Sequence, residues 1–380
     1  MLFKEQAKAE THSRQRKKMD IKRLVRPELI TMAGYTPIEP LETVSQYAGL
    51  PSDRGVKLDA NENPYGCSPR VYQALADYSR YHIYPDPEQR MLRQALENYT
   101  GLSQQYIICG SGSDELIDLT LRLFVEPGDE VINCPPTFGM YPFNTEICGG
   151  EVVNIPRGED FTIDIGNIEG ALNKKTKAIF VASPNNPTGN LITEQEIVEL
   201  LDTEKIVVLD EAYFEFSNVT RANLVSHHPN LIVLRTFSKW AGLAGLRMGY
   251  GIFPVEIATY LMKIKQPYNI NAAAQVAALT SLADIDYLSS NIARIVAERE
   301  RLFIKLKEFD WLQPYPSQGN FILCSVIDGD AKAIWSQLRK KGIFVRYFDS
   351  PQLRNYLRIT AGKPEDTDAL IEALKGVKND

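Results

Sequence analysis

Two side chains that are able to do chemistry stand directly after apolar runs of the sequence. Asp210 follows the run Ile206–Leu209, and Lys239 closes the segment Thr236–Lys239 after another apolar run. An ionised aspartate at the end of a buried strand needs a cationic or strongly donating partner, such as a protonated pyridine nitrogen. A helix N-cap is an equally good interpretation of Asp210 alone. A lysine in such a place is either a solvated surface charge or an amine whose pKa is lowered by desolvation and neighbouring cations.

Glycines and hydroxyls in two further segments suit an anion. The segment Gly110–Glu115 follows a short predicted strand and opens a helix, so its glycines let the backbone approach an anion and its free N–H groups bind it. Taken alone, a plain capped glycine turn explains the segment better, because it lacks the P-loop lysine and the dinucleotide spacing GxGxxG. The hydroxyls of Thr236 and Ser238, with the guanidinium of Arg247, would clamp a phosphate.

Two more polar or aromatic turns follow predicted strands. Phe138 ends the segment Pro135–Phe138, where its ring is able either to stack on a planar ligand or to pack in the core. The segment Ser183–Gly189 has the Asn, Pro and Gly that any turn needs. Its two adjacent asparagines also offer amide donors at the carboxyl end of a strand.

The composition excludes several classes of partner. The chain has 380 residues, 44% apolar content and a net charge of −6, which argues against nucleic acid because domains that neutralise a nucleic-acid backbone normally carry a clustered basic excess. The five cysteines are scattered, without a CxxC pair or a metal-ligand spacing, so we expect reduced thiols and no metal site. No apolar run reaches eighteen residues, and the first nineteen lack the apolar core of a signal peptide. We expect small-molecule partners, no membrane and a cytoplasmic location.

The elements that must position these residues alternate between strand and helix. The predicted strands are Tyr106–Cys109, Glu130–Cys134, Glu151–Ile155, Ala178–Ala182, Ile206–Asp210, Leu231–Thr236 and Gly249–Ile252. The predicted helices are Asp114–Phe124, Gly139–Cys148, Thr193–Leu201 and Glu256–Lys265, with a short one around Leu41–Tyr47, and a long helical stretch is predicted over Ala272–Phe309. Such alternation predicts an α/β fold with a mostly parallel sheet covered on both faces, which binds ligands at the carboxyl ends of its strands.

The pattern also divides the chain into segments. We expect a disordered or flexible arm over 1–25 and an extended connector over 26–60 that packs with a small C-terminal domain. A large ligand-binding domain is predicted over 61–270, and the small domain over 271–380.

The ordered motifs GSGSDE, PPTFGMY, SPNNPTG, LDEAY, TFSK with GLRMG, and LRIT resemble those of the class I/II aminotransferases, from Tyr35 to the end of the chain. Within that family they are most similar to the histidinol-phosphate branch. The resemblance implies an aspartate-aminotransferase-like fold (fold type I), with a large domain around a mostly parallel sheet and a smaller α+β domain. It also implies pyridoxal 5'-phosphate as cofactor and a homodimer with shared active sites.

The resemblance assigns a role to each matching residue. Those implied to be catalytic are Lys239, which bonds the cofactor and moves protons, Asp210, which keeps the pyridine nitrogen protonated, and Tyr213 at the phenolic oxygen. Those implied to bind the cofactor are Gly112, Ser113, Asp114, Phe138, Asn186, Thr236, Ser238, Arg247 and, across the dimer interface, Tyr84. Those implied to bind substrate are Tyr35, Arg346 for a phosphate and Arg358 for a carboxylate.

The implied reaction transfers an amino group from L-histidinol phosphate to 2-oxoglutarate, giving imidazole acetol phosphate and L-glutamate, a step of histidine biosynthesis. An aromatic amino acid aminotransferase and a threonine-phosphate decarboxylase are the alternatives. A non-catalytic effector domain of a transcription regulator would need a DNA-binding domain, for which the stretch before Tyr35 is too short. Two departures from the family pattern, Trp240 and Ile38-Glu39, bear on the substrate and not on the cofactor.

Overall fold

The structure is a computed structural model that describes residues 19–35, 37–40, 43, 49 and 55–377. The chain separates into two units, residues 1–34 and 35–380. In the first unit, a 3₁₀ turn η1 (Ile21–Arg23) is capped by Asp20, and the short helix α1 (Pro27–Thr31) begins with a proline at its first position. Most of the predicted arm 1–25 and nearly all of the predicted helix Leu41–Tyr47 lie outside the described residues.

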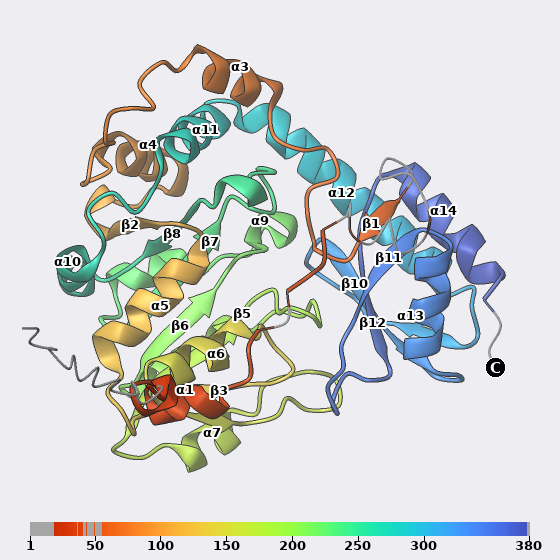
Figure 1. Cartoon of the computed structure of the whole chain (residues 1–380), viewed down its shortest axis with the longest axis horizontal. Coiled ribbons are helices and arrows are strands. Elements are labelled where there is room, and N and C mark those ends of the chain that lie inside the picture. Colours follow the sequence, from red (N-terminus) through yellow and green to blue (C-terminus); the bar gives the residue numbers. More distant parts are fainter. Residues whose placement is uncertain (1–18, 36, 41–42, 44–48, 50–54, 378–380) are drawn as a thin grey trace, which may run out of the picture. The chain divides into compact units, whose positions relative to one another are not determined.

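A seven-stranded sheet forms the centre of the second unit (Figure 1). Its strands, in spatial order, are β2 (Ile107–Gly110), β8 (Gly249–Ile252), β7 (Leu231–Thr236), β6 (Ile206–Asp210), β5 (Thr176–Ala182), β3 (Glu130–Asn133) and β4 (Glu151–Asn154). Only β8 runs antiparallel to its neighbours, β2 and β7. The expected mostly parallel sheet is therefore confirmed, and each predicted strand lies within two residues of its observed bounds.

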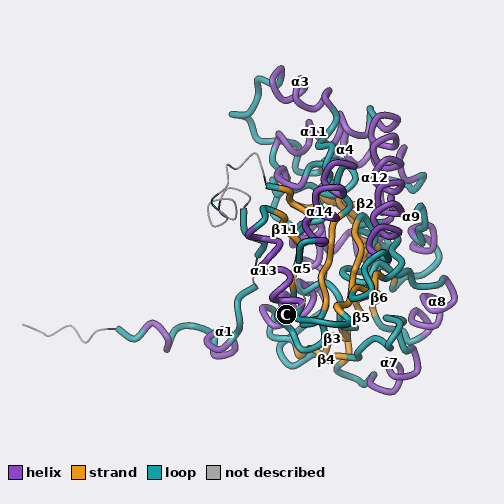
Figure 2. The backbone as a smooth tube through the Cα atoms, turned by 90° about the vertical axis from the view of Figure 1, so that its right-hand side faces the viewer, coloured by secondary structure: helices purple, strands orange, loops and turns teal. Residues whose placement is uncertain are grey.

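The central strands β5, β6 and β7 are buried on both faces because their apolar residues are continuous. In β5, Ile179 and Val181 join the core on one face, while Ala178, Phe180 and Ala182 join the core on the other. Figure 2 shows α5 and α8 on opposite sides of these strands. The helices of this part of the chain are α3 (Pro69–Asp77), α4 (Arg90–Thr100), α5 (Ser113–Phe124), α6 (Met140–Ile147), α7 (Ile165–Ala171), α8 (Glu194–Asp202), α9 (Phe214–Ser217) and α10 (Val255–Ile264).

A second, five-stranded sheet gathers the C-terminal strands and one early strand. Its spatial order is β1 (Val56–Leu58), β11 (Ile343–Tyr347), β12 (Tyr356–Thr360), β10 (Phe321–Val326) and β9 (Leu312–Pro314). The helices α13 (Ala331–Lys340) and α14 (Pro364–Lys375) pack against it. The strand β1 pairs in parallel with β11, so this early segment is part of the C-terminal sheet. The domain limits drawn from the sequence stay predictions.

The helical stretch predicted over Ala272–Phe309 is confirmed, and the structure divides it into two helices. They are α11 (Ala272–Leu282) and α12 (Ile285–Leu306). Between them, the carboxylate of Asp284 accepts a hydrogen bond from Ser68 Oγ and pairs with Arg70 at 3.3 Å. An aspartate whose side chain is held in this way favours a helix end over a helix interior. Leu288 and Ile295 of α12 then join the core of the large sheet, and Leu302 and Leu306 join that of the small sheet.

Among the described residues, no helix is both long and apolar enough to cross a membrane.

Candidate active site

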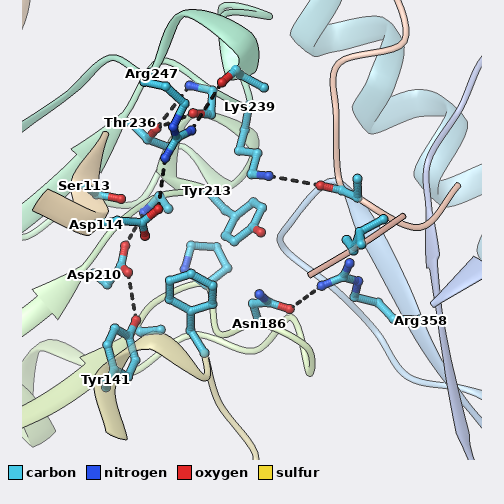
Figure 3. A pocket seen from close by; sticks show the side chains of 18 of the residues that line it. Ser113, Asp114, Tyr141, Asn186, Asp210, Tyr213, Thr236, Lys239, Arg247 and Arg358 are labelled. Carbon is cyan, nitrogen blue, oxygen red and sulfur yellow. Dashed lines mark hydrogen bonds and ion pairs between the residues drawn. The ribbon is translucent and has the colours of Figure 1, made fainter. Parts of the chain in front are cut away.

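A cavity of about 200 Å³ opens where β5, β6 and β7 end and α5 begins (Figure 3). This is the position that a parallel sheet predicts for a ligand site. Most of the candidate residues from the sequence line it: Tyr35, Ser113, Asp114, Phe138, Asn186, Asp210, Tyr213, Thr236, Ser238, Lys239, Arg247 and Arg358. Residues that lie up to 323 positions apart in the sequence, from Tyr35 to Arg358, therefore meet in one cavity.

Lys239 presents its amine to this cavity. Its Nζ donates to the backbone oxygen of Ala60 at 3.0 Å, and no carboxylate among the described residues forms an ion pair with it. Burial, together with the nearby charge of Arg358, lowers the pKa of Lys239 to about 8. An amine with such a pKa is partly neutral near pH 8 and is able to act as a nucleophile or a base.

Asp210 is a buried carboxylate that no described cation pairs with. Its side chain is 4% exposed, and it accepts hydrogen bonds from Tyr141 Oη at 2.7 Å and from the Ala212 N–H at 3.0 Å. Burial raises the pKa of Asp210 to about 6. The helix α9 begins at Phe214 with Tyr213 at the N-cap position, so Asp210 does not cap it. The surroundings leave Asp210 suited to a cationic group of a ligand.

The turn before α5 provides an anion site. Gly112 has φ +79°, and a Cβ there would lie 2.6 Å from Arg247 Nη2. A Cβ on Gly249 would lie 2.5 Å from the Ser113 nitrogen, so both glycines are needed for the backbone to pack here. No side chain caps α5 at Gly112, which leaves first-turn N–H groups for a ligand.

The hydroxyls and the guanidinium of the predicted phosphate cup lie beside this turn. Thr236 Oγ1 donates to Ser238 Oγ at 2.9 Å and accepts from the Ser238 N–H at 3.1 Å. Arg247 Nη2 pairs with Asp114 at 2.9 Å, while its Nη1 donates to the Ala244 oxygen at 3.2 Å. A carboxylate repels a phosphate, so Asp114 is not suited to contact one directly. Through its ion pair with Arg247 it instead orients the guanidinium.

The structure separates the two adjacent asparagines of the turn after β5. Asn185 is fully buried, where it accepts from Thr137 Oγ1 and donates to the Pro136 oxygen, so it holds the turn together. Asn186 lines the cavity, and its Oδ1 accepts from Arg358 Nη1 at 2.6 Å. Only Asn186 is placed to contact a ligand.

The two candidate substrate arginines lie directly opposite each other on β11 and β12. Arg358 is 5% exposed, its Nη2 donates to the Asp59 oxygen, and its buried Nε has no partner among the described residues. Burial lowers the pKa of Arg358 to about 10. Arg346 lines a neighbouring cavity whose wall includes Arg358 and Asn186. Like charges that face each other across a strand pair repel, so this rim favours an anion.

Comparison with known proteins gives these features a family. Residues 53–374 match the model of aminotransferase class I and II. The chain belongs to this family. It is 50% identical to a histidinol-phosphate aminotransferase of Dehalococcoides mccartyi, over 93% of this chain and 98% of that protein.

Two further relatives widen the comparison. A chloroplastic histidinol-phosphate aminotransferase of Arabidopsis thaliana is 49% identical over 92% of this chain and 85% of its own length. The crystal structure of the enzyme from Sinorhizobium meliloti, in complex with pyridoxal-5'-phosphate, superposes with a TM-score of 0.84 at 28% identity, covering 92% of this chain and 96% of that one. The expected aspartate-aminotransferase-like fold is confirmed.

Two residues of this class I/II aminotransferase site were missed from the sequence. Tyr141 donates to Asp210, and it follows Phe138 by three residues, so the spacing of one helical turn in PPTFGMY was the available signal. Asn61 donates from Nδ2 to Tyr213 Oη at 2.9 Å, and it has a φ of +54°. Asparagine tolerates that backbone conformation better than most residues, but nothing in the sequence links it to Tyr213.

Tyr84 is the one cofactor candidate that lies well away from the cavity. Its side chain is 77% exposed and stacks on Tyr268, with ring centroids 4.4 Å apart. It does not line the cavity of its own chain.

The two departures from the family pattern have different positions. Trp240 is 1% exposed, stacks on Tyr99 and does not line the cavity, so it leaves the ligand-facing surface unchanged. Ile38 does line the cavity, and Glu39 pairs with Arg339 of α13 at 2.8 Å. Of the two departures, only the second includes a residue that lines the cavity.

Proposed function

We propose that this aminotransferase moves the amino group of L-histidinol phosphate to 2-oxoglutarate, forming imidazole acetol phosphate and L-glutamate, with pyridoxal 5'-phosphate as its cofactor. The observation that carries the chemistry is that one cavity holds a half-buried amine, Lys239, and a buried carboxylate, Asp210, neither of which has an ionic partner among the described residues. The choice of substrate follows the names of relatives that are about half identical over nearly the whole chain.

The residues of the cavity fit this cofactor. The turn at Gly112, with Thr236, Ser238 and Arg247, would hold the phosphate. Asp210 would face the pyridine nitrogen, whose positive charge supplies the missing counter-charge. The remaining contacts would come from Phe138 against the ring and from Tyr213 and Asn186 at the phenolic oxygen.

Residues of the chain would control which atoms are protonated during the reaction. When bound, the cofactor supplies an aldehyde for the amino group and a ring that accepts electrons when the substrate Cα loses its proton. Asp210, held by Tyr141, keeps a proton on the pyridine nitrogen. The amine of Lys239, whose pKa burial lowers to about 8, moves the proton between Cα and the aldehyde carbon.

Two arginines at the rim let one site accept two different anions. Arg358 would bind a carboxylate of glutamate or 2-oxoglutarate, and Arg346, on the neighbouring strand, would bind the phosphate of histidinol phosphate. Tyr35 and Ile38 also line both cavities, so they would close over either substrate.

Spectroscopy of the purified protein tests the proposal. Pyridoxal 5'-phosphate should give a visible absorbance band, which histidinol phosphate should remove as the cofactor takes up the amino group, and 2-oxoglutarate should restore it. Phenylalanine and phosphothreonine serve as comparison substrates. Faster bleaching by phenylalanine would favour an aromatic aminotransferase, and release of carbon dioxide from phosphothreonine would favour a decarboxylase.

We also propose that the active form is a homodimer in which Tyr84 reaches the partner's phosphate. The support is that Tyr84 is exposed, stacks on the exposed Tyr268 and lies near the exposed Tyr81, Ile83 and Met91 in the sequence. Mixing inactive Lys239→Ala and Tyr84→Ala chains should restore activity, because each hybrid dimer has one intact site. Mixtures no more active than their components would contradict shared sites.

We propose a cytoplasmic location, which is supported by bacterial relatives and by five cysteines that form no disulfide in the described part of the chain, although the Arabidopsis relatives are named chloroplastic. Fractionation of the source cells, with activity followed in each fraction, tests it.

A further inference from the structure

Three neighbouring strands place charged or phenolic side chains behind the cofactor cavity. Glu211 follows Asp210, Arg235 precedes Thr236, and Tyr250 follows Gly249. Because successive residues of a strand point to opposite faces, Asp210 and Thr236 line the cavity while Glu211 and Arg235 face the other side of the sheet. On the third strand, Gly249 packs against Ser113 and Tyr250 faces that other side. The apolar residues agree with this division: Val208, Ile232 and Leu234 join the core on the α5 side, whereas Leu209 and Val233 join the opposite one.

The three side chains form one buried cluster. Arg235 is 3% exposed and donates from Nε and Nη2 to Glu211 Oε2, at 3.0 and 2.9 Å. Its Nη1 donates to Tyr250 Oη at 3.2 Å. Thr220 Oγ1 donates to Glu211 Oε2 at 2.8 Å, and the ring of Phe214 lies 3.6 Å from the Arg235 guanidinium carbon. We call Glu211, Arg235 and Tyr250 the rear cluster.

Strand pairing and one backbone hydrogen bond connect the rear cluster to the residues that line the cavity. Arg235 pairs with Tyr250, and Thr236 with Gly249, in the register of β7 and β8. The N–H of Glu211 donates to the Leu234 oxygen at 2.8 Å, which joins the end of β6 to β7. A movement of any member of the cluster therefore moves Asp210, Thr236 or the glycine against which Ser113 packs.

Stability alone is a weak reason for such a cluster. Two charges taken out of water cost free energy that their attraction only partly returns, and apolar residues of similar volume are often as stable. Glu215 of α9 is also close to Arg235, but burial raises the pKa of its carboxyl well above the usual value, so Glu211 supplies the counter-charge. A buried ion pair of fixed geometry does provide a defined spacing between the strands that carry it.

We propose that the rear cluster consists of positioning residues, which fix the spacing between Asp210 on β6 and the phosphate-binding hydroxyl of Thr236 on β7. The two residues would hold opposite ends of the cofactor, so their spacing must match its length. This inference rests on the proposed function, because it concerns the binding of pyridoxal 5'-phosphate.

The test uses variants of the full chain that separate positioning from folding. Glu211→Gln removes the charge but keeps the shape, and Glu211→Gln with Arg235→Met removes both charges. Tyr250→Phe removes a single hydroxyl. The matched control is Glu298→Gln on α12, whose carboxylate is 5% exposed and pairs with Arg301 at 3.1 Å but does not line the cavity. For each, the dissociation constant of pyridoxal 5'-phosphate, the visible circular dichroism of the bound cofactor and the unfolding temperature of the cofactor-free protein are measured.

Both Glu211 variants should bind pyridoxal 5'-phosphate about ten-fold more weakly and lose visible circular dichroism, as expected when a supporting contact behind a binding residue is removed. Tyr250→Phe should show the same change at about a third of that size. Glu298→Gln should lower the unfolding temperature only. The double variant and Tyr250→Phe decide the matter if Glu211→Gln does not fold.

Cofactor affinity and dichroism that stay within about two-fold of wild type in folded rear-cluster variants would overturn the proposal, as would an equal loss in Glu298→Gln. Failure of the wild-type chain to bind pyridoxal 5'-phosphate at all would instead sink the proposed function.

Discussion

The charged residues on the two sides of β6 and β7 differ in whether they have an ionic partner. Behind the sheet, Glu211 and Arg235 are buried, paired at 2.9 Å and surrounded by further hydrogen bonds. In the cavity, Asp210 and Lys239 are held by protein dipoles, but neither has an ionic partner among the described residues. The sequence neighbours Asp210 and Glu211 therefore lie in opposite electrostatic environments, although one peptide bond joins them.

This difference shows how a ligand site is distinguished from a structural cluster. Burial raises the pKa of Asp210 to about 6 and lowers that of Lys239 to about 8, so both charged forms are unfavourable without a ligand. The rear cluster provides its own counter-charges. A cavity whose charged groups have no counter-charge from the protein favours a ligand that supplies one. Four experiments test this difference between the cavity and the rear cluster.

The largest effect should come from Lys239→Ala, which removes the amine that bonds the cofactor and moves the proton. We expect the visible absorbance of the bound cofactor to disappear and the transamination rate to fall by about 10⁴-fold. The control is Lys265→Met, which changes a buried lysine, 6% exposed, outside the cavity, and should keep measurable activity. A yellow and active Lys239→Ala protein would contradict the assignment of Lys239.

Asp210→Asn should change activity and stability in opposite directions. The rate should fall by about 100- to 1,000-fold, because the ring nitrogen loses the charge that keeps it protonated. Since the pKa of Asp210 rises from an ordinary 3.8 to about 6, the folded cofactor-free protein holds more protons between these values, and its stability falls as the pH rises through them.

The asparagine variant has no carboxyl group to ionise at this position, so its stability does not fall over this pH range. At pH 7 the free energy of unfolding of the cofactor-free variant should therefore exceed that of wild type by up to about 3 kcal/mol. Denaturant unfolding of both proteins at pH 4 and pH 7 measures the difference. A variant that is less stable than wild type at pH 7 would show that Asp210 has a counter-charge after all.

Lys239 should shape the alkaline stability of the cofactor-free protein. Its pKa falls from an ordinary 10.5 to about 8 through burial, so the unfolded chain binds more protons between these values. The free energy of unfolding should therefore rise from pH 8 to pH 10.5, by at most about 3 kcal/mol from this group. In Lys239→Met this rise should disappear. An identical pH slope in both proteins would mean that the amine is solvated.

The smallest effect should be a change of substrate preference in Arg346→Ala. Loss of a charged hydrogen bond to phosphate should cost about 2 kcal/mol of transition-state stabilisation for histidinol phosphate, which lowers its kcat/KM about 30-fold. The kcat/KM for glutamate should fall much less. Arg358→Ala, its cross-strand neighbour, is the matched variant and should harm glutamate at least as strongly as histidinol phosphate. Equal losses for both substrates in Arg346→Ala would count against its assignment to the phosphate.

Much of this protein follows from local sequence. The alternation of β-type runs and amphipathic helices predicted the mostly parallel sheet, because side-chain periodicity and burial on both faces are properties of short segments. The ends of those runs marked Asp210, Asn186, Thr236 and Lys239, all of which line the cavity, because strand ends of a parallel sheet meet at one edge.

Other features depend on distant contacts and were decided by the tertiary structure. The break before α12 depends on contacts of the Asp284 carboxylate with Ser68 and Arg70, which lie more than 200 positions earlier in the chain. The hydrogen bond from Asn61 to Tyr213 joins residues 152 positions apart. A sequence fixes which atoms are able to donate, accept or carry charge. Only the folded chain decides which of them meet and which charges are left for a ligand, since pairing and desolvation depend on neighbours that are far away in sequence.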